Sequence, residues 1–278
     1  MAEKAILYDP TRCTACRGCQ VACKQWNEND EYIPPPSDEN GVQSKNRGSY
    51  ENPPDLSSKT WLKIEFREVE RKGKLDWLFT RRACMHCTDA ACVKVCPSGA
   101  LYHHELGFVA YNKDICTGCG YCADFCPFQV PRSDRTLWSG IAKMDKCTLC
   151  TTPDLDRITN GYEPACVKTC PTDALIYGDR TKLVAEGKKR VQNSGGNAYL
   201  YGEKELGGLH VMYVLDDSPA VYGLPVAPQI SAATIAWQDV IQPLGWALGG
   251  LTIIGLGINY LVAREAKLTR ELPGKKEE

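Results

Sequence analysis

Apolar and charged residues alternate along parts of this chain with the two-residue period of a β-strand. Residues 61–70 show this alternation over their whole length, and residues 75–80 repeat it after a glycine, which predicts a hairpin. Residues 4–8 and 209–215 are short apolar runs that we also interpret as strands. Residues 181–191, followed closely by a Ser-Gly-Gly turn, are predicted to form a helix. Short strands mixed with few helices predict an α+β fold.

The longest apolar stretch lies near the C-terminus. Residues 244–263 carry no charge, and about twenty residues are the length that an α-helix needs to cross a bilayer. Trp237 and Trp246 at one end and Tyr260 at the other suit the two membrane interfaces. A buried core helix is the alternative, but a core seldom supplies so long an uncharged run beside a polar tail. We therefore expect a single transmembrane helix.

Basic residues are distributed unequally around this span. Lysine and arginine are absent from residues 206–263, whereas five follow the span, namely Arg264, Lys267, Arg270, Lys275 and Lys276. The positive-inside rule then places the tail, residues 264–278, in the cytoplasm and the rest of the chain on the outer side. No signal peptide is expected, because residues 1–4 lead directly into the first strand. A folded domain would therefore cross the membrane together with a partner that carries a signal.

Two stretches show no periodicity. Residues 29–60 are rich in proline, serine, asparagine and acidic residues, which predicts a long loop. Such a loop either clasps a partner subunit or is a solvated insertion. Residues 219–228 contain three prolines and are expected to form an extended connector.

One residue type changes this picture. The chain has 278 residues and a formal net charge of −1, which gives no indication of nucleic-acid binding. It also has 16 cysteines, and all of them fall into four runs of four. The runs are Cys13, Cys16, Cys19 and Cys23; Cys84, Cys87, Cys92 and Cys96; Cys116, Cys119, Cys122 and Cys126; and Cys147, Cys150, Cys166 and Cys170.

The third run shows why this spacing matters. From Cys116 to Pro127 it has the pattern C-x2-C-x2-C-x3-C-P, which binds [4Fe–4S] clusters in bacterial ferredoxins. Three thiolates two residues apart can all face one cube of iron and sulfide, on a loop that Gly118 and Gly120 make flexible. The fourth cysteine lies one helical turn further on and ligates a neighbouring cluster. The other runs vary this pattern, most strongly the fourth, which has a long insertion before its third cysteine.

Structural zinc and disulfide bonds are the alternatives. Zinc sites also use paired C-x2-C units, but they rarely add a third cysteine two residues on and a fourth before a proline. Disulfides would suit a secreted scaffold, whereas these cysteines follow cluster spacing with none left over. His86 lies inside the second run, but the cysteines complete the ligand count, so we interpret it as a loop residue near the cluster. The sequence therefore predicts iron–sulfur clusters.

An internal repeat and a group of basic residues accompany the runs. Residues 91–101 match residues 165–175 at eight of eleven positions, which indicates duplicated cluster-binding units. Eight basic residues stand near the cysteines, and each either offsets the negative charge of a cluster or is an ordinary surface charge. They are Arg12, Arg17, Arg81, Arg82, Lys94, Lys143, Lys146 and Lys168.

These motifs resemble those of a known family over nearly the whole chain. Residues 13–27 (CTACRGCQVACKQWN), residues 81–101 (RRACMHCTDAACVKVCPSGAL) and the single C-terminal span are similar to the iron–sulfur subunit of membrane-bound formate dehydrogenases. Related subunits serve nitrate, dimethyl sulfoxide and polysulfide reductases and some hydrogenases. In the family, the polypeptide forms two ferredoxin-like domains that carry four [4Fe–4S] clusters.

The resemblance implies how this chain is divided. The first ferredoxin-like domain would be discontinuous and the second would lie within it, followed by the membrane segment. The expected parts are residues 1–30 with 140–228 for the first domain, 31–60 for an insertion loop, 61–139 for the second domain, 229–243 for a connector, 244–263 for the transmembrane helix and 264–278 for the cytoplasmic tail.

The resemblance also assigns the ligands of each cluster, with every fourth cysteine of a run crossing to another cluster. Set 1 would be Cys13, Cys16, Cys19 and Cys170, and set 2 would be Cys23, Cys147, Cys150 and Cys166. Set 3 would be Cys84, Cys87, Cys92 and Cys126, and set 4 would be Cys96, Cys116, Cys119 and Cys122.

Partners and location follow from the same resemblance. The expected function is electron transfer from a catalytic subunit with a molybdopterin or tungstopterin cofactor to a membrane cytochrome b and quinone. The expected location is the bacterial inner membrane, with the clusters on the periplasmic side. An equivalent subunit of a hydrogenase or reductase complex is the alternative. No catalytic site is expected in this chain, because no carboxylate pair, Ser–His arrangement or phosphate-binding glycine loop stands out.

Overall fold

The computed structural model describes residues 2–29, 50, 51, 53–71, 73–133 and 142–271, the side chains of residues 238 and 269–271 excepted. The chain divides into two compact units, Met1–Ile230 and Ser231–Glu278, and each is considered by itself. Most of the expected insertion loop, residues 30–49 and 52, lies outside the described residues, as does the end of the tail.

The largest sheet in the described part of the first unit has four strands in the order β8-β1-β10-β9. These strands are β1 (Lys4–Tyr8), β8 (Leu175–Asp179), β9 (Tyr199–Tyr201) and β10 (Val211–Leu215). β1 pairs in parallel with β10 and antiparallel with β8. The strand predicted at residues 4–8 is confirmed. The strand predicted at residues 209–215 begins at Val211, because Leu209 forms an isolated bridge with Cys87 instead.

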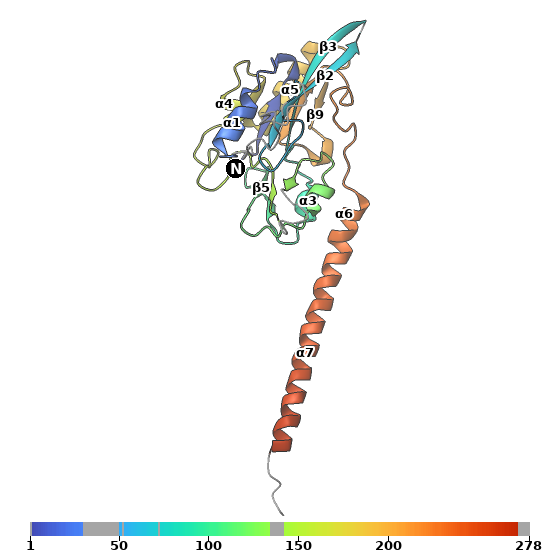
Figure 1. Ribbon diagram of the computed structural model, residues 1–278. Helices are drawn as coiled ribbons and strands as arrows, with labels where there is room; N and C mark the ends of the chain where they lie inside the picture. The colour runs from blue at the N-terminus through green and yellow to red at the C-terminus, as the bar shows by residue number, and fades with distance from the viewer. Residues whose placement is uncertain (1, 30–49, 52, 72, 134–141, 272–278) are drawn as a thin grey trace, which may run out of the picture. The chain divides into compact units, whose positions relative to one another are not determined.

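Helix α5 (Arg180–Ser194) covers one face of this sheet (Figure 1). Leu7 of β1 and Leu200 of β9 belong to the same apolar cluster as Leu183 of the helix. A Cβ atom on Gly187 would come within 2.6 Å of the Leu200 side chain. The glycine therefore lets the helix pack closely on the sheet, and the predicted helix is confirmed with slightly wider bounds.

The other face of the sheet meets the cysteines. Successive side chains of a strand point to opposite faces, so Ile6 and Tyr8 lie on the face away from α5. They pack in a buried cluster that also contains Cys19 and Cys166. The sheet thus forms one wall of the region where the cysteines gather.

The predicted hairpin is present and longer than expected (Figure 1). Strands β2 (Leu62–Arg71) and β3 (Lys74–Ala83) pair antiparallel, from Leu62 opposite Ala83 to Arg71 opposite Lys74. The alternation of apolar and polar residues ended at residue 80 in the sequence because two arginines follow. Backbone pairing with the apolar start of β2 extends the strand through these arginines.

A short helix carries the third cysteine of every run. These helices are α1 (Gly18–Trp26), α2 (Ala91–Lys94), α3 (Tyr121–Asp124) and α4 (Ala165–Lys168). The fourth cysteine follows one turn later, inside α1 or just beyond the other three. The repeat seen in the sequence therefore has the same local structure twice, and Gly99 and Asp173, which differ in residue type, both have positive φ.

Small elements complete the first unit. Two further pairs of strands are β4 (Leu101–His103) with β5 (Val109–Tyr111) and β6 (Arg132–Ser133) with β7 (Met144–Asp145). Two 3-10 turns are η1 (Pro10–Arg12) and η2 (Glu205–Gly207).

The segment that was expected to be an extended connector is partly folded. Residues 219–223 form a turn, and Tyr222 is 1% exposed. The Thr80 hydroxyl of β3 donates a hydrogen bond to the Tyr222 carbonyl, and the Tyr222 hydroxyl donates to Asp216. The expectation of an extended connector was wrong here, because a buried aromatic side chain anchors the turn to the hairpin.

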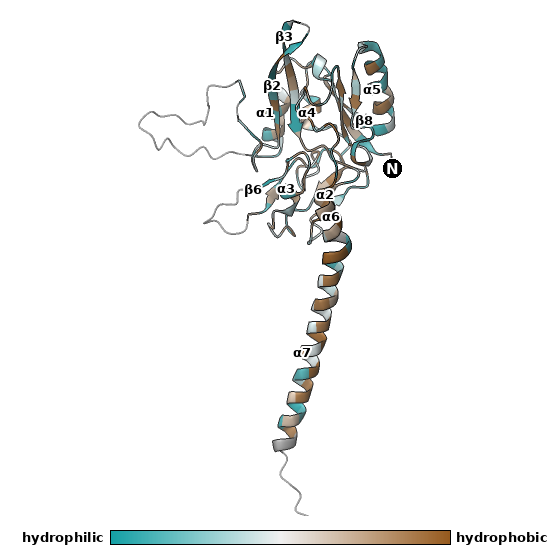
Figure 2. Ribbon diagram, turned by 90° about the vertical axis from the view of Figure 1, so that its right-hand side faces the viewer, coloured by the Kyte–Doolittle hydropathy of each residue, from teal (hydrophilic) through white to brown (hydrophobic). Residues whose placement is uncertain are grey.

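The described part of the second unit, residues 231–271, is helical almost throughout. It contains α6 (Ala232–Ala236), a π-helical turn η3 (Trp237–Ile241) and the long helix α7 (Gln242–Glu271). The helix thus begins before the predicted span, within residues expected to be a connector. Figure 2 shows that apolar residues dominate most of α7, and Leu244, Leu251 and Ile258 are all more than half exposed. The described residues contain one helical segment, Ala232–Leu268, that is long and apolar enough to cross a membrane.

Candidate iron–sulfur sites

All sixteen cysteines lie in the described part of the chain, and each is a free thiol. The disulfide alternative is therefore wrong. Burial divides the thiols unequally: Cys16 and Cys119 are exposed, and every member of set 2 is buried.

Set 2 surrounds one internal cavity. All four of its cysteines line that cavity, together with Arg81, Trp61 and Leu149. Cys23 comes from α1 and Cys166 from α4, and these two helices pack against each other. Thiols from the first and fourth runs therefore meet here, although more than a hundred residues separate them in the chain.

Set 4 surrounds a second, more open cavity. Its cysteines all line this space, with Tyr111, Gly118 and Met144. Cys96 comes from the end of the second run and meets the first three cysteines of the third run. The crossing of a fourth cysteine to its neighbour's site is therefore visible in the lining of this cavity.

The thiols of sets 1 and 3 also gather, as their mutual electrostatic effects show. Burial is the main cause that raises the pKa of Cys13, and the nearby Cys170 and Cys16 thiols raise it further. Burial likewise raises the pKa of Cys87, and its thiol neighbours are the other three members of set 3. The cysteines of sets 2 and 4 therefore each line one cavity, and thiols within sets 1 and 3 lie near one another.

The loops between neighbouring cysteines turn tightly, which lets their thiols face the same cluster. Ala15, His86, Gly118 and Leu149 each have positive φ and lie between two cysteines of a C-x2-C unit. Glycine adopts this conformation without strain, which accounts for Gly118. Two backbone amides inside these loops point at sulfur: the Ala15 amide donates to Cys13 Sγ and the Leu149 amide donates to Cys147 Sγ, each at 3.4 Å.

Burial of several thiols together has an electrostatic consequence. Desolvation, with smaller contributions from adjacent thiols, raises the pKa of Cys19, Cys122 and Cys150 to about 12. Four buried thiolates would repel each other unless a cation compensated them. Iron supplies that positive charge and takes thiolate ligands, so the donor sets fit a thiolate-ligated iron cluster.

A single zinc ion fits these sites less well. Within the described ranges, no three His, Cys, Asp or Glu side chains converge closely enough to hold one metal ion. A zinc site requires that convergence, since Zn–S bonds of about 2.3 Å bring the four sulfurs close together. A cube of iron and sulfide keeps its ligands further apart, so thiols spread around a cavity favour a cluster.

The eight basic residues near the cysteines differ widely in environment. Arg81 and Lys146 are each 1% exposed, whereas Arg12, Lys143 and Lys168 are exposed. The remaining three are partly exposed. Arg82 and Lys94 form ion pairs with carboxylates, and Arg17 stacks on Phe66. Only two of the eight are therefore fully buried charges.

The residues around set 3 were only partly anticipated. His86 was interpreted as a loop histidine, but its side chain is completely buried and its Nδ1 atom lies 3.1 Å from the Val109 carbonyl. Burial lowers its pKa well below the ordinary value, which keeps the ring neutral. His210 packs nearby, with Nδ1 2.9 Å from the His86 carbonyl. No sequence motif pointed to His210, because it lies more than a hundred residues away.

The fold and the gathered thiols define the class of protein. It is a ferredoxin-like electron-transfer protein that carries [4Fe–4S] clusters, with a C-terminal apolar helix. A family model described as "4Fe-4S dicluster domain" matches residues 75–180, a region that includes the whole of the second, third and fourth runs.

Comparison with three relatives shows to which family within this class the chain belongs. The chain is 40% identical to the "Formate dehydrogenase, nitrate-inducible, iron-sulfur subunit" of Escherichia coli K12, over 94% of this chain and 85% of the relative. It is 39% identical to the "Formate dehydrogenase-O iron-sulfur subunit" of the same organism, over 97% and 89%. It is 30% identical to the "Hydrogenase-2 operon protein HybA" of Escherichia coli O157:H7, over 90% and 83%. The chain belongs to the family of formate dehydrogenase iron–sulfur subunits, and it is an electron-transfer subunit, not a catalytic one.

Proposed function

We propose that this chain holds four [4Fe–4S] clusters, one in each of sets 1 to 4, and connects a catalytic formate dehydrogenase subunit to a membrane acceptor. The observation that carries the proposal is that eight of the sixteen cysteines line two cavities, four in each, and thiols within the other two sets lie near one another. When bound, each cluster accepts and releases one electron. The chain's own residues hold the thiolates, exclude water and fix the distances.

The four sets follow one another in the order 1, 2, 3, 4. Burial is the largest influence on these thiols, but members of different sets also raise one another's pKa where the sets adjoin. The three adjoining pairs are Cys19 with Cys166, Cys84 with Cys147, and Cys92 with Cys122. Each pair joins consecutive sets, which supports a continuous row of cofactors.

The ends of this row reach the surface. Cys16 of set 1 and Cys119 of set 4 are the exposed thiols, whereas all four cysteines of set 2 are buried. Electron exchange with another protein requires a short distance from its cofactor to the surface. We therefore infer that electrons enter at one of these two ends and leave at the other.

The proposed partners are a catalytic subunit with a molybdopterin or tungstopterin cofactor and a membrane cytochrome b that reduces quinone. Two relatives are named as formate dehydrogenase iron–sulfur subunits, which supports the first partner. The uncharged length of α7 supports the second, because it suits insertion into a bilayer. The basic tail supports a periplasmic position for the clusters in the bacterial inner membrane. The division into two ferredoxin-like domains remains part of this proposal.

Truncation separates the roles of the two units. A chain that ends at Ile230 lacks the whole helical unit and should still bind four clusters and pass electrons from formate to a soluble dye. It should fail to support quinone reduction, and the cluster-bearing unit should be released from the membrane. Quinone reduction at the full rate by the truncated protein would contradict the proposed membrane role.

Orientation needs its own test. Protease added to the outside of spheroplasts should digest the cluster-bearing unit and leave a tag on the C-terminus protected. Protection of the cluster-bearing unit together with digestion of the tag would place the chain the other way round.

A hydrogenase complex is the second candidate, because the hydrogenase-2 operon protein HybA matches 90% of this chain. The complex purified from membranes distinguishes the two possibilities. Mass spectrometry of its subunits should identify a pterin-containing catalytic subunit, and formate should reduce the clusters. Reduction by hydrogen, together with a nickel-containing catalytic subunit, would instead support the hydrogenase assignment.

A further inference from the structure

Arg81 is a buried positive charge that lacks an acidic partner. Its side chain is 1% exposed, and none of its guanidinium nitrogens donates a hydrogen bond to a carboxylate or a carbonyl within the described ranges. No carboxylate of the described chain forms an ion pair with it. A buried, unpaired guanidinium is strongly unfavourable, so its retention requires negative charge nearby.

That negative charge can come from sulfur. Burial would lower the pKa of Arg81, but the Cys166 thiol, Tyr213 and the Cys147 thiol raise it above its ordinary value. In return, Arg81 lowers the pKa that burial raises at Cys19 and Cys166. The guanidinium is therefore close to sulfur ligands of both set 1 and set 2.

The lining of the set 2 cavity places Arg81 beside set 2 by geometry. Arg81 lines that cavity together with all four cysteines of the set. Cys19, a member of set 1, packs in the same buried cluster as Cys166 of set 2. Arg81 thus lies where the first two sets adjoin.

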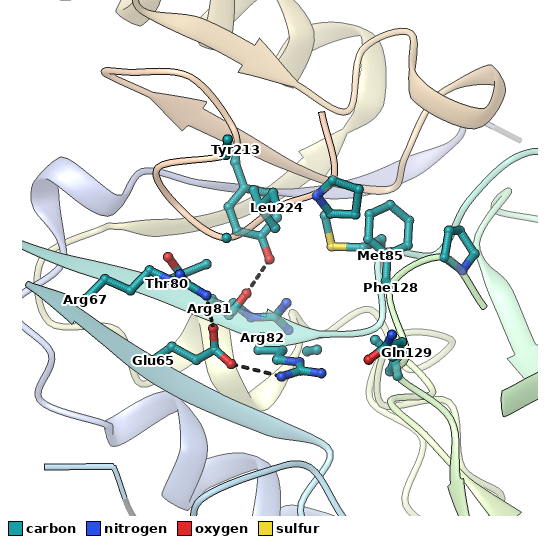
Figure 3. A pocket seen from close by; sticks show the side chains of 16 residues that line it. Glu65, Arg67, Thr80, Arg81, Arg82, Met85, Phe128, Gln129, Tyr213 and Leu224 are labelled. Atoms are coloured by element: carbon teal, nitrogen blue, oxygen red, sulfur yellow. Dashed lines mark hydrogen bonds and ion pairs between the residues drawn. The ribbon is translucent and has the colours of Figure 1, made fainter. Parts of the chain in front are cut away.

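The next residue in the chain has the opposite environment. Strand alternation points Arg82 to the other face of the hairpin, where its guanidinium lies 3.1 Å from a Glu65 carboxylate oxygen (Figure 3). It also lies 3.4 Å from a carboxylate oxygen of Asp55. Its charge is therefore neutralised by carboxylates. The backbone carbonyl of Arg81 accepts a hydrogen bond from the Tyr213 hydroxyl at 2.5 Å, which holds this strand against the sheet.

We propose that Arg81 is a potential-setting residue that raises the reduction potentials of the clusters in sets 1 and 2. The inference rests on the proposed function, since it requires clusters in those sets. Reduction adds negative charge to a cluster, and a fixed buried cation stabilises the reduced form more than the oxidised form. Arg81 also supplies the countercharge that two adjoining thiolate-ligated clusters need in a dry interior.

Redox titration of the intact complex, followed by electron paramagnetic resonance of the individual clusters, tests this role. Arg81→Met removes the charge and keeps much of the length, Arg81→Lys keeps the charge, and Arg82→Met is the matched control. In Arg81→Met, the midpoints of two clusters should move to lower potential. At the wild-type midpoint, their ratio of reduced to oxidised form should fall by roughly tenfold or more, the order expected for one charge a few ångströms away.

The other variants make the result specific. Arg81→Lys should restore most of the shift, and Arg82→Met should leave all midpoints close to those of the wild type. Unchanged midpoints in Arg81→Met with four clusters bound, or an equal shift in Arg82→Met, would overturn the inference. If the wild-type complex itself lacks four [4Fe–4S] signals, the proposed function fails before any variant is compared.

If Arg81→Met fails to bind clusters, its midpoints cannot be measured, and a second comparison tests the role of the charge. Arg81→Gln is then compared with Arg81→Lys by iron content. Cluster loading in the lysine variant alone would show that the charge is required and would support the countercharge role. Failure of the lysine variant as well would show that only the shape of arginine matters, which would overturn the inference.

Discussion

Set 2 and set 4 are built from the same motif and differ in their surroundings. All four cysteines of set 2 are buried, and Arg81 shares their cavity. In set 4 only Cys122 is buried, Cys119 is exposed, and the cavity is lined by Gly118 and Gly120 as well as by larger side chains. The comparison teaches that the cysteine spacing fixes which cofactor is bound, whereas burial and nearby charge fix how that cofactor behaves.

The largest difference between the sets should appear on loss of a ligand. Cys166→Ser disrupts a group in the core that also packs with Ile6 and Tyr8, so it should prevent the first unit from accumulating in a folded form. Cys119→Ser lies at the surface and should cost about four irons, the content of one cluster, with the other three clusters retained. Iron analysis and protease resistance measure both effects. Equal damage from the two variants would contradict the contrast.

Chemical attack should distinguish the sets without mutation. A chelator or oxidant in water reaches Cys119 directly, whereas set 2 is covered. The electron paramagnetic resonance signal of the set 4 cluster should therefore be lost before that of set 2 in a time course. Simultaneous loss of both signals would show that exposure does not control access.

Lys146 lies where sets 2 and 3 adjoin, beside Cys147 of set 2 and close to Cys84 of set 3. Its ammonium donates to the Val109 and Cys147 carbonyls, each at 2.9 Å, and it is 1% exposed. Lys146→Met would remove a donor from each of these two buried carbonyls, of which that of Val109 keeps His86 Nδ1 nearby, and should destabilise the first unit by about 2 kcal/mol. The nearby exposed Lys143 is the matched control, and Lys143→Met should change stability by less than about 0.5 kcal/mol. The midpoint of denaturant unfolding measures both, and similar midpoints for the two variants would disprove the role of Lys146.

The smallest expected effect lies in set 4. Burial alone would raise the pKa of Cys116, but the nearby Tyr111 hydroxyl and backbone amides outweigh it and leave the pKa lowered. Hydrogen bonds to cluster sulfurs raise reduction potential, so Tyr111→Phe should move the set 4 midpoint slightly downward. The shift should be smaller than that of Arg81→Met. A shift in set 2 in place of set 4 would contradict the assignment.

The periodicity of apolar residues predicted those strands and helices whose own sequence carries that periodicity. The strand at residues 4–8, the hairpin and the helix after residue 180 all follow from periodicity. The spacing of the cysteines predicted iron–sulfur clusters and a fourth cysteine that crosses to another cluster, whereas the assignment of each cysteine to a set came from the family resemblance. The role of Gly187 could not be predicted in this way. It leaves room for the Leu200 side chain of another element, and no local pattern reveals that contact.

Arg81 and Arg82 show most clearly what could not be predicted from the sequence. Both residues precede the second run and were equivalent in the sequence. The strand was expected to end before them, so alternation could not be applied. Pairing of Ile64 with Arg81 extends the hairpin and directs one arginine inward and the other outward. His210 escaped prediction for a similar reason, because only the tertiary fold brings it to His86.

The central claim is that the sixteen cysteines hold four [4Fe–4S] clusters, and native mass spectrometry of the anaerobically isolated chain tests it most directly. The account predicts a mass above that of the polypeptide equal to four clusters, with sixteen irons and sixteen sulfides, since every one of the sixteen cysteines is a free thiol in one of the four sets. A mass that corresponds to two or three clusters, or to zinc ions without sulfide, would contradict it.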